Sequence, residues 1–479
     1  MTRISPWALL CGLLLSPVAL ANWQLKVAPE LLNPAPGTEW MVALPHTADL
    51  SPADSIPDKA LKGAFVMHTL KEQARSTQGP LLNLLQSLGL EHRSYWISNA
   101  VHVRGGDALA LQQIANLPGV DYIHAVAAPD FSRSAAPMPQ STPTQSARAE
   151  ADSGMMVEPG LLLVRADEVW ADGIEGQGAV VGDHDIGVEW THPALKNNYR
   201  GYDAESDSAV HDYNWRNAFG ALDPFCGTDE PCDSHDHGTH TTGTMVGEDK
   251  NANLRIGMAP KAEWIACRSL LDPVVGLGTF PSYLDCMQWF IAPHPIDDTS
   301  AGDPALAPDV VNNSWGCLEA CIPPMLKDAN DATKAAGIVQ VVSAGNDGGE
   351  CSTILFPLAV YEESFSVGAS NFEDEMAGFS SRGPVLSDLS MRTKPNVVAP
   401  GVSINSATTG NGYGSMSGTS MAGPHVAGLV ALMISAEPRL RGQVDVIRSL
   451  IEETAVPINN DQACGETGAQ DIPNNVFGY

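Results

Sequence analysis

The chain has 479 residues, which exceeds one typical hydrophobic core and predicts about two or three folding units. Its 26 basic and 56 acidic residues give a formal net charge of −30, which argues against a nucleic-acid partner because an acidic surface repels phosphates. A hydrophobic content of 44% with 44 Gly and 35 Pro is typical of a turn-rich globular protein with a solvated acidic surface.

Residues 1–21 have the features of an export signal. Arg3 supplies the positive end, residues 7–15 form a short apolar run, and ALA at 19–21 gives the small-x-small cleavage pattern. The apolar run is too short to span a bilayer, and no later stretch is long and apolar enough to predict a transmembrane helix. The sequence therefore predicts a secreted protein, either extracellular or periplasmic.

The cysteine count indicates disulfides. Nine cysteines occur, and the eight that follow the signal form an even number, as expected for an exported chain. Proximity in sequence favours pairing Cys226 with Cys232 and Cys267 with Cys286. A zinc site is the alternative, but no C-x-x-C pair occurs. Pairing stays open among the remaining four, which are Cys317, Cys321, Cys351 and Cys464.

The region before residue 129 predicts a small domain behind a Pro-rich segment. Residues 22–62 are Pro-rich and give no clear periodic signal. Residues 63–128 alternate between strand and helix patterns, with Asp107 as a candidate N-cap. The expected elements are strand 64–67, helix 79–90, strands 95–97 and 101–103, helix 107–117 and strand 120–123. This β-α-β-β-α-β order predicts a two-layer α/β domain.

Two composition changes divide the rest of the chain. Residues 129–157 are rich in Pro, Ser, Thr and Ala without hydrophobic periodicity, so they predict an exposed linker that is open to cleavage. From 158 to 479, apolar strand patterns alternate with helical ones, which predicts a mostly parallel, doubly wound α/β sheet. Strands are expected at 179–181, 262–267, 309–312 and 338–342, with a helix at 330–336. Functional sites in such sheets gather at the carboxyl ends of the strands.

Ser420 is the candidate nucleophile. It lies in the string SGTSMAGPHVAG, directly before an apolar helical segment, where free backbone N–H groups and the helix dipole favour an oxyanion. Pro424 is tolerated best in a first helical turn, so it predicts a helix start near the serine. The alternative role is a simple helix cap.

His237 is the candidate general base. It lies in the string HDHGTH, where Gly238 permits the close approach that proton transfer requires. His235 and His240 lie beside it, so a metal cluster is the alternative. The spacing matches no common zinc signature, and we therefore expect no metal and local structural roles for these two histidines.

Asp185 and Asp183 compete for a third role in the string GDHDIGVEWTHP. A buried carboxylate is needed to orient the histidine and to stabilise its charged form. Residue chemistry alone does not choose between the two aspartates, and an aspartate before glycine is also a common turn residue.

Asn346 follows the expected strand at 338–342, in the string SAGNDG. Its side-chain amide can donate to a developing oxyanion, an interaction worth about 3–4 kcal/mol in the transition state. The alternative is a turn asparagine with positive φ.

At these four places the chain resembles the subtilisin-like serine peptidases, over about residues 158–470. The resemblance assigns the histidine, serine and oxyanion roles to His237, Ser420 and Asn346. The family's aspartate motif is D-[ST]-G-[IV] followed by His-Pro, and this register assigns the triad aspartate to Asp185, with Ile186 departing from the pattern. The residues that fix the register are Gly187, Val188, His192, Pro193 and Leu195.

Further strings extend the resemblance to the bacillopeptidase F-like branch, among them HPALKNNYRGYD, PDVVNNSWG and KPNVVAPGV. Ser314, Trp315 and Gly316 resemble the segment that pairs with the substrate backbone and walls the primary specificity pocket, and Trp315 suggests an altered wall. Residues 63–128 resemble the inhibitory propeptide, which makes 129–157 the expected processing region. The family's PNNVFGYG usually continues, so we expect a trimmed or incomplete end at Tyr479.

The resemblance implies a secreted endopeptidase that hydrolyses protein or peptide substrates through an acyl-enzyme and is inhibited by its own propeptide. It implies no redox or organic cofactor. Calcium is common in the family, but no acidic loop here is specific enough to name ligands. Two alternatives remain, which are a catalytically silent binding protein of the same fold and a metallopeptidase that uses the histidine cluster.

Overall fold

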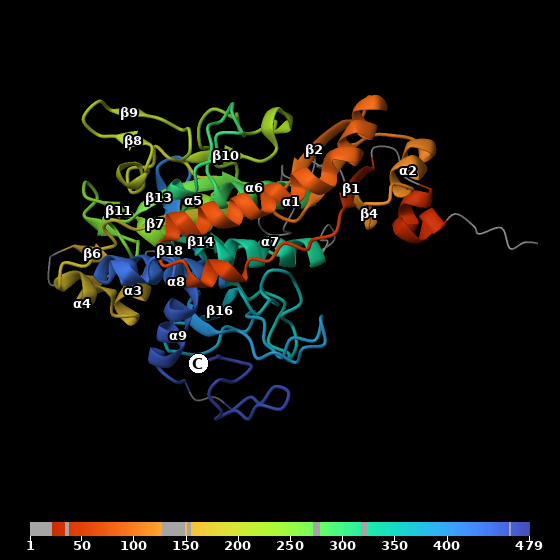
Figure 1. The fold of residues 1–479 in the computed structure, drawn as a ribbon. Coiled ribbons are helices and arrows are strands. Elements are labelled where there is room, and N and C mark those ends of the chain that lie inside the picture. The colour runs from red at the N-terminus through yellow and green to blue at the C-terminus, as the bar shows by residue number, and fades with distance from the viewer. Residues whose placement is uncertain are drawn as a thin grey trace, which may run out of the picture.

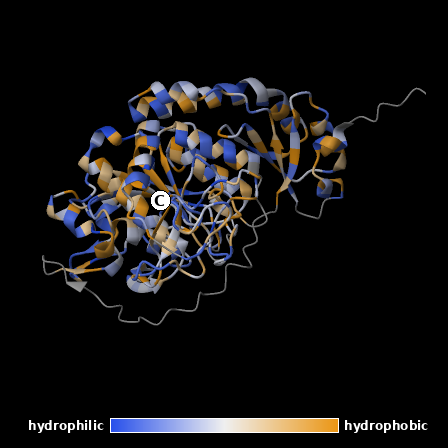
Figure 2. Ribbon diagram, turned by 90° about the horizontal axis from the view of Figure 1, so that it is seen from below, coloured by the Kyte–Doolittle hydropathy of each residue, from blue (hydrophilic) through white to orange (hydrophobic). Residues whose placement is uncertain are grey.

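The computed structural model describes residues 22–33, 38–126, 149–150, 155–271, 278–317, 323–458 and 461–479. The expected signal, most of the expected linker and Cys321 lie outside the described residues. The described chain forms an N-terminal unit with a four-stranded sheet and a larger α/β unit with a seven-stranded sheet (Figure 1). Hydrophobic residues lie on the strands of the N-terminal sheet in the hydropathy view (Figure 2).

The N-terminal unit has the predicted β-α-β-β-α-β order, with its strands antiparallel in the order β2-β3-β1-β4. Asp107 caps α2 as predicted, because its side chain accepts from the N–H of Ala110. The elements are β1 (Glu39–Ala43), α1 (Lys59–Ser87), β2 (Glu91–Tyr95), β3 (Ala100–Arg104), α2 (Ala108–Ala115) and β4 (Tyr122–Val126). Short 3₁₀ turns precede α1 at η1 (Asn22–Lys26), η2 (Pro29–Leu32) and η3 (Ser51–Ser55).

The first strand was predicted in the wrong place. Residues 64–67 lie inside α1, and the strand is β1, within the segment 22–62 that gave no periodic signal. Asp58 caps α1 by accepting from the N–H of Leu61, and Val66 and Leu70 share one buried helix face at i, i+4 spacing. A four-residue apolar run fits either a strand or part of such a face, so the pattern alone was ambiguous.

The larger unit confirms the predicted parallel α/β sheet. Every neighbouring pair of its strands is parallel, and the strand order is β10-β13-β7-β14-β15-β16-β17. The strands are β7 (Val180–Asp185), β10 (Trp215–Asn217), β13 (Glu263–Arg268), β14 (Val310–Asn313), β15 (Val339–Ser343), β16 (Phe365–Ser370) and β17 (Val397–Pro400).

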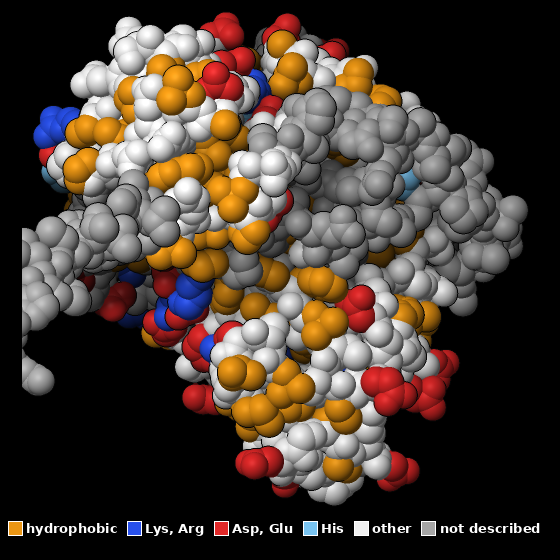
Figure 3. Space-filling view, turned by 90° about the vertical axis from the view of Figure 1, so that its right-hand side faces the viewer, with side chains coloured by type: hydrophobic (Ala, Val, Ile, Leu, Met, Phe, Trp, Pro, Cys, Tyr) orange, Lys and Arg blue, Asp and Glu red, His pale blue; other side chains and the backbone are white. Residues whose placement is uncertain are grey.

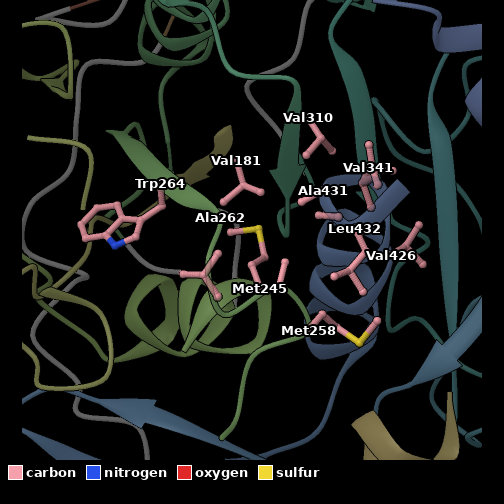
Figure 4. Packing of buried hydrophobic residues seen from close by; sticks show 14 of the residues in the cluster. Val181, Met245, Met258, Ala262, Trp264, Val310, Val341, Val426, Ala431 and Leu432 are labelled. Atoms are coloured by element: carbon pink, nitrogen blue, oxygen red, sulfur yellow. The ribbon is translucent and has the colours of Figure 1, made fainter. Parts of the chain in front are cut away.

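Helices cover both faces of this sheet. Helices α5 (His237–Val246) and α8 (Thr419–Ala436) share one core cluster, while α6 (Phe280–Ile291) and α7 (Pro323–Ala335) share another. Figure 4 shows Val181, Val310 and Val341 of the strands packing with Met245 of α5 and Leu432 of α8. The remaining helices are α3 (Pro159–Leu163), α4 (Ala166–Ala171) and α9 (Val444–Thr454), with η5 (Lys196–Asn198), η6 (Gly220–Leu222), η7 (Pro304–Leu306) and η8 (Pro438–Leu440).

Small sheets complete the architecture around the main sheet. Two antiparallel hairpins, β8–β9 and β18–β19, accompany a mixed sheet in the order β11-β12-β6-β5. Their strands are β5 (Ala149–Glu150), β6 (Met156–Val157), β8 (Tyr202–Asp203), β9 (Ser208–Ala209), β11 (Glu248–Asp249), β12 (Leu254–Arg255), β18 (Ile404–Thr408) and β19 (Gly412–Met416).

Contrary to the expectation from sequence, one described helix, α8, is long and apolar enough to cross a membrane by length and composition. In this fold 72% of it is buried, which is the condition of a core helix.

Figure 3 views the end of the molecule that carries the N-terminal unit and shows acidic side chains spread over its described surface.

The N-terminal unit packs on the α6–α7 side of the main sheet. Val66 and Leu70 of α1 belong to the same hydrophobic cluster as residues of α6 and α7. The backbone N–H groups of Trp96 and Ile97 donate to Gln288 Oε1 of α6 at 2.8 and 3.3 Å. The Nζ of Lys62 donates to the carbonyl of Gly442 at 2.9 Å. The two units are therefore joined by apolar packing and by hydrogen bonds.

The two disulfides favoured by sequence, Cys226–Cys232 and Cys267–Cys286, are present, and a third joins Cys351 to Cys464. The third closes a loop of 113 residues, against six for Cys226–Cys232. Chain entropy gives about 5 kcal/mol of stabilisation for the long loop and about 2 kcal/mol for the short one.

We therefore expect the double variant Cys351→Ser/Cys464→Ser to lower the free energy of unfolding more than the matched variant Cys226→Ser/Cys232→Ser. Urea unfolding of both variants under oxidising conditions measures the difference. A larger loss from the short loop would contradict the chain-entropy account.

Candidate active site

An aspartate and a histidine meet at the carboxyl end of β7, an inner strand of the main sheet. Asp185 ends β7 and is fully buried, and His237 is the first residue of α5. His237 Nδ1 lies 2.9 Å from both carboxylate oxygens of Asp185. A hydrogen bond from Nδ1 fixes the imidazole tautomer and leaves Nε2 as the basic nitrogen.

Asp183 lies on the same strand but makes different contacts. Its carboxyl group receives hydrogen bonds from Thr241 Oγ1 at 3.2 Å and from Asn312 Nδ2 at 3.3 Å. Burial, together with the neighbouring Asp185, raises the pKa of Asp183 well above its usual range. Burial thus disfavours the charged form of Asp183, and Asp185 is the aspartate that contacts His237.

Backbone groups hold Asp185 despite the departure at Ile186. The N–H of Ile186 donates to Asp185 Oδ1 at 2.7 Å, and the N–H of Ser269 donates to the Asp185 carbonyl at 3.0 Å. The Ile186 side chain is buried in the hydrophobic core. The carboxylate thus has a backbone donor, the Ile186 N–H, where a Thr or Ser at this position would also supply a hydroxyl.

Ser420 is the second residue of α8, as expected for a serine at a helix N-terminus. Its Oγ donates to the carbonyl of Ser314 at 3.3 Å. Pro424 lies inside the helix, beyond the first turn in which it was expected. Because proline has no N–H for the carbonyl four residues earlier, the Ser420 carbonyl is free to accept from Ser314 Oγ at 3.0 Å.

Asn346 lies beside this helix end, in the loop after β15. Its Oδ1 accepts from the Thr419 N–H at 2.9 Å and from Thr419 Oγ1 at 3.0 Å. These two bonds fix the amide so that Nδ2 is its donor. The preceding Gly345 has φ +110°, a backbone conformation that favours glycine. An amide donor and the backbone N–H groups of a helix N-terminus therefore lie together.

The 314–316 segment follows β14, and its three residues have different surroundings. The Trp315 side chain is only 4% exposed, stacks on Tyr283 at 4.4 Å and meets His184 edge-on at 4.9 Å. The indole therefore lies in the core, and not at a pocket surface as the sequence suggested. A Cβ at Gly316 would lie 3.7 Å from Phe356, a neighbour that no sequence signal identified.

His240, beside His237, serves local structure. His240 Nε2 bonds to the carbonyls of Ile404 and Gly414 at 3.0 and 3.2 Å, and burial lowers its pKa to about 3. The backbone N–H of His235 donates to Asp233 Oδ1 at 2.7 Å. Across the part of the chain that the structure describes, no three His, Cys, Asp or Glu side chains are grouped to hold a metal ion.

The parallel sheet, the Asp–His contact at its carboxyl edge and the serine at a helix N-terminus define a subtilisin-like α/β protein. The signature of the Subtilase family matches residues 176–479, and the chain belongs to this family.

Several curated proteins are similar to the chain. Bacillopeptidase F of Bacillus subtilis (strain 168) is 32% identical over 94% of the chain and 30% of that protein. The thermophilic serine proteinase of Bacillus sp. (strain AK1) is 36% identical over 57% of the chain and 56% of that protein. Subtilisin DY of Bacillus licheniformis is 32% identical over 63% of the chain and 92% of that protein. The chain thus spans less than a third of the first protein and just over half of the second.

Proposed function

We propose that this chain is the precursor of an exported serine endopeptidase. The contact between Asp185 and His237 Nδ1 carries the proposal. Ser420 Oγ attacks the scissile carbonyl carbon while His237 Nε2 takes its proton and then donates it to the leaving amine. Water, activated by the same nitrogen, hydrolyses the acyl-enzyme. Asp185 holds the imidazole in the required tautomer throughout.

Binding groups for the reacting peptide lie around the serine. The Asn346 amide and the Ser420 backbone N–H would donate to the oxyanion, which forms when the carbonyl carbon becomes tetrahedral. Hydrogen bonds between Ser314 and Ser420 hold the 314–316 segment beside the serine. The backbone of this segment would pair with the substrate chain. No step of this mechanism requires a metal or an organic cofactor.

A chelator and a serine reagent test the class of chemistry. We expect casein cleavage to be blocked by a serine-directed fluorophosphonate and to continue in 1,10-phenanthroline, which removes zinc but binds calcium weakly. Loss of activity in phenanthroline, with no response to the fluorophosphonate, would favour a metallopeptidase and contradict the proposal.

We also propose that the N-terminal unit acts as an intramolecular inhibitor and is removed after residues 1–21 are cleaved. Its own hydrophobic core and its packing against α6 support a separable unit. N-terminal sequencing and intact mass of the secreted product test this. The expected product begins within 129–157, and an active product that retains residues 63–128 covalently would contradict it.

The Asn346→Ala variant isolates the oxyanion contribution. We expect kcat to fall by about 10²–10³-fold with KM nearly unchanged, because the amide acts mainly in the transition state. Asn251→Ala, at an exposed loop residue between β11 and β12, is the matched control and should retain wild-type kcat. Steady-state kinetics on a peptide substrate measure kcat and KM in both variants. Equal kcat in both variants would remove Asn346 from the mechanism.

A further inference from the structure

A buried ion pair lies directly behind the Asp–His contact. Arg268 ends β13 and pairs with Asp223, with Nε to Oδ2 at 2.6 Å and both side chains fully buried. Burying two charges costs several kcal/mol per ion, and apolar residues of similar volume often stabilise a core as well or better. Stability alone is therefore a weak reason for this pair.

The guanidinium contacts the backbone that carries Asp185. Arg268 and Asp185 are direct partners in the register of β13 and β7. Arg268 Nη1 donates to the carbonyl of Ile186, whose N–H donates in turn to Asp185 Oδ1. The residue after the arginine, Ser269, donates its N–H to the Asp185 carbonyl at 3.0 Å. Arg268 and its neighbour thus hold the two peptide groups that follow the aspartate, 185–186 and 186–187.

The same guanidinium contacts the loop that leads to His237. Residues 218–236, here called the histidine loop, connect β10 to α5. This loop contains Asp223, and also Ser234, whose Oγ accepts from Arg268 Nη1 at 3.1 Å. The Cys226–Cys232 disulfide closes the middle of the loop. Arg268 is therefore a direct link between the Asp185 segment and the histidine loop.

The two segments also touch each other at a glycine. Gly187 has φ +104°, and a Cβ there would lie 1.9 Å from the carbonyl oxygen of Cys232. Within the histidine loop, Asp233 accepts from the N–H and Oγ1 of Thr239, in the first turn of α5, at 2.9 and 2.6 Å. A shift of this loop would therefore move the helix end that carries His237.

We propose that Arg268, neutralised by Asp223, is a positioning residue that fixes the Asp185 segment and the histidine loop relative to each other. The inference depends on the proposed peptidase function. Arg268 acts through the Ile186 carbonyl and Ser234 and does not contact substrate. Its effect is to keep the carboxylate aimed at His237 Nδ1, so it acts on the chemical step and not on substrate binding.

The test compares Arg268→Met, Arg268→Lys and Asp223→Asn with the matched control Arg255→Met. Arg255 pairs with Glu175 and Glu248 in a partly buried site outside the main sheet. We expect Arg268→Met to lower kcat by up to about 100-fold, with KM changed less than about threefold. Arg268→Lys should recover only part of the loss. It restores the positive charge, but one ammonium cannot bond to both segments as the guanidinium does.

The pH dependence of kcat/KM gives a readout that a merely structural role would not move. Arg268→Met leaves the buried Asp223 carboxylate unpaired, and its negative charge favours protonated His237. The acid limb of the kcat/KM profile, over which His237 takes up its proton, therefore moves to higher pH. Asp223→Asn leaves an unpaired guanidinium and moves the limb to lower pH. Opposite displacements support the proposal.

The proposal is overturned if Arg268→Met loses activity only as its folded fraction falls, with an unmoved acid limb, as expected for Arg255→Met. If Arg268→Met does not fold, the acid limb of Asp223→Asn decides, and an unmoved limb overturns the proposal. An inactive wild-type protein in the same assay would instead count against the proposed peptidase function.

Discussion

Replacing Ser420 with alanine is expected to abolish peptide hydrolysis, with kcat falling by about 10⁶-fold. The variant lacks the oxygen that forms the acyl-enzyme, so only binding and oxyanion stabilisation remain. The fold should be unaffected, because Ser420 Oγ makes one long hydrogen bond, 3.3 Å to the Ser314 carbonyl.

The matched control for this variant is Ser435→Ala, the same change near the other end of α8. Ser435→Ala should retain wild-type kcat, and near-ultraviolet circular dichroism should be the same in both variants. Wild-type kcat in Ser420→Ala would assign the nucleophile elsewhere.

The Asp185→Asn variant is expected to lower kcat by about 10⁴-fold. An asparagine can present its NH₂ group to His237 Nδ1, which stabilises the wrong tautomer and removes the negative charge that supports the imidazolium. Steady-state kinetics over a range of pH values would measure the loss.

Asp183→Asn is the natural comparison, because it makes the same chemical change two residues earlier on β7. Burial already raises the pKa of Asp183, and an amide oxygen can still accept from Thr241 and Asn312. We expect kcat to stay within about tenfold of wild type, since a surviving hydrogen-bond partner leaves the core satisfied. A larger loss from Asp183→Asn than from Asp185→Asn would reverse the proposed roles.

Local strings predicted most of the main sheet and the candidate site. The apolar runs before Asp185 and Asn346 are the strands β7 and β15, and the serine string begins α8. The strand and helix predictions succeed because each element is one continuous segment, while the catalytic roles stay a prediction. The sequence also paired Cys226 with Cys232 correctly, because the two are close along the chain.

Features that depend on long-range packing were not predicted. Residue chemistry alone did not separate Asp183 from Asp185, and the choice of Asp185 rested on the resemblance, because the position of α5 decides which one meets His237. Trp315 was expected at a pocket wall, but Tyr283 offers it a stacking partner in the core.

Two further features were missed. A helix was expected only over residues 79–90, yet α1 begins at Lys59 and continues through Pro80. Arg268 gave no signal either, since its partner Asp223 lies 45 residues earlier, in the histidine loop, and only the folded chain brings the two together.

The most direct test of the central claim is peptide mapping of the protein after reaction with a serine-directed fluorophosphonate. The account predicts one adduct, on Ser420, which disappears when His237 is replaced by alanine because the serine is no longer activated. An adduct on another serine, or full labelling of Ser420 without His237, would contradict the proposed catalytic site.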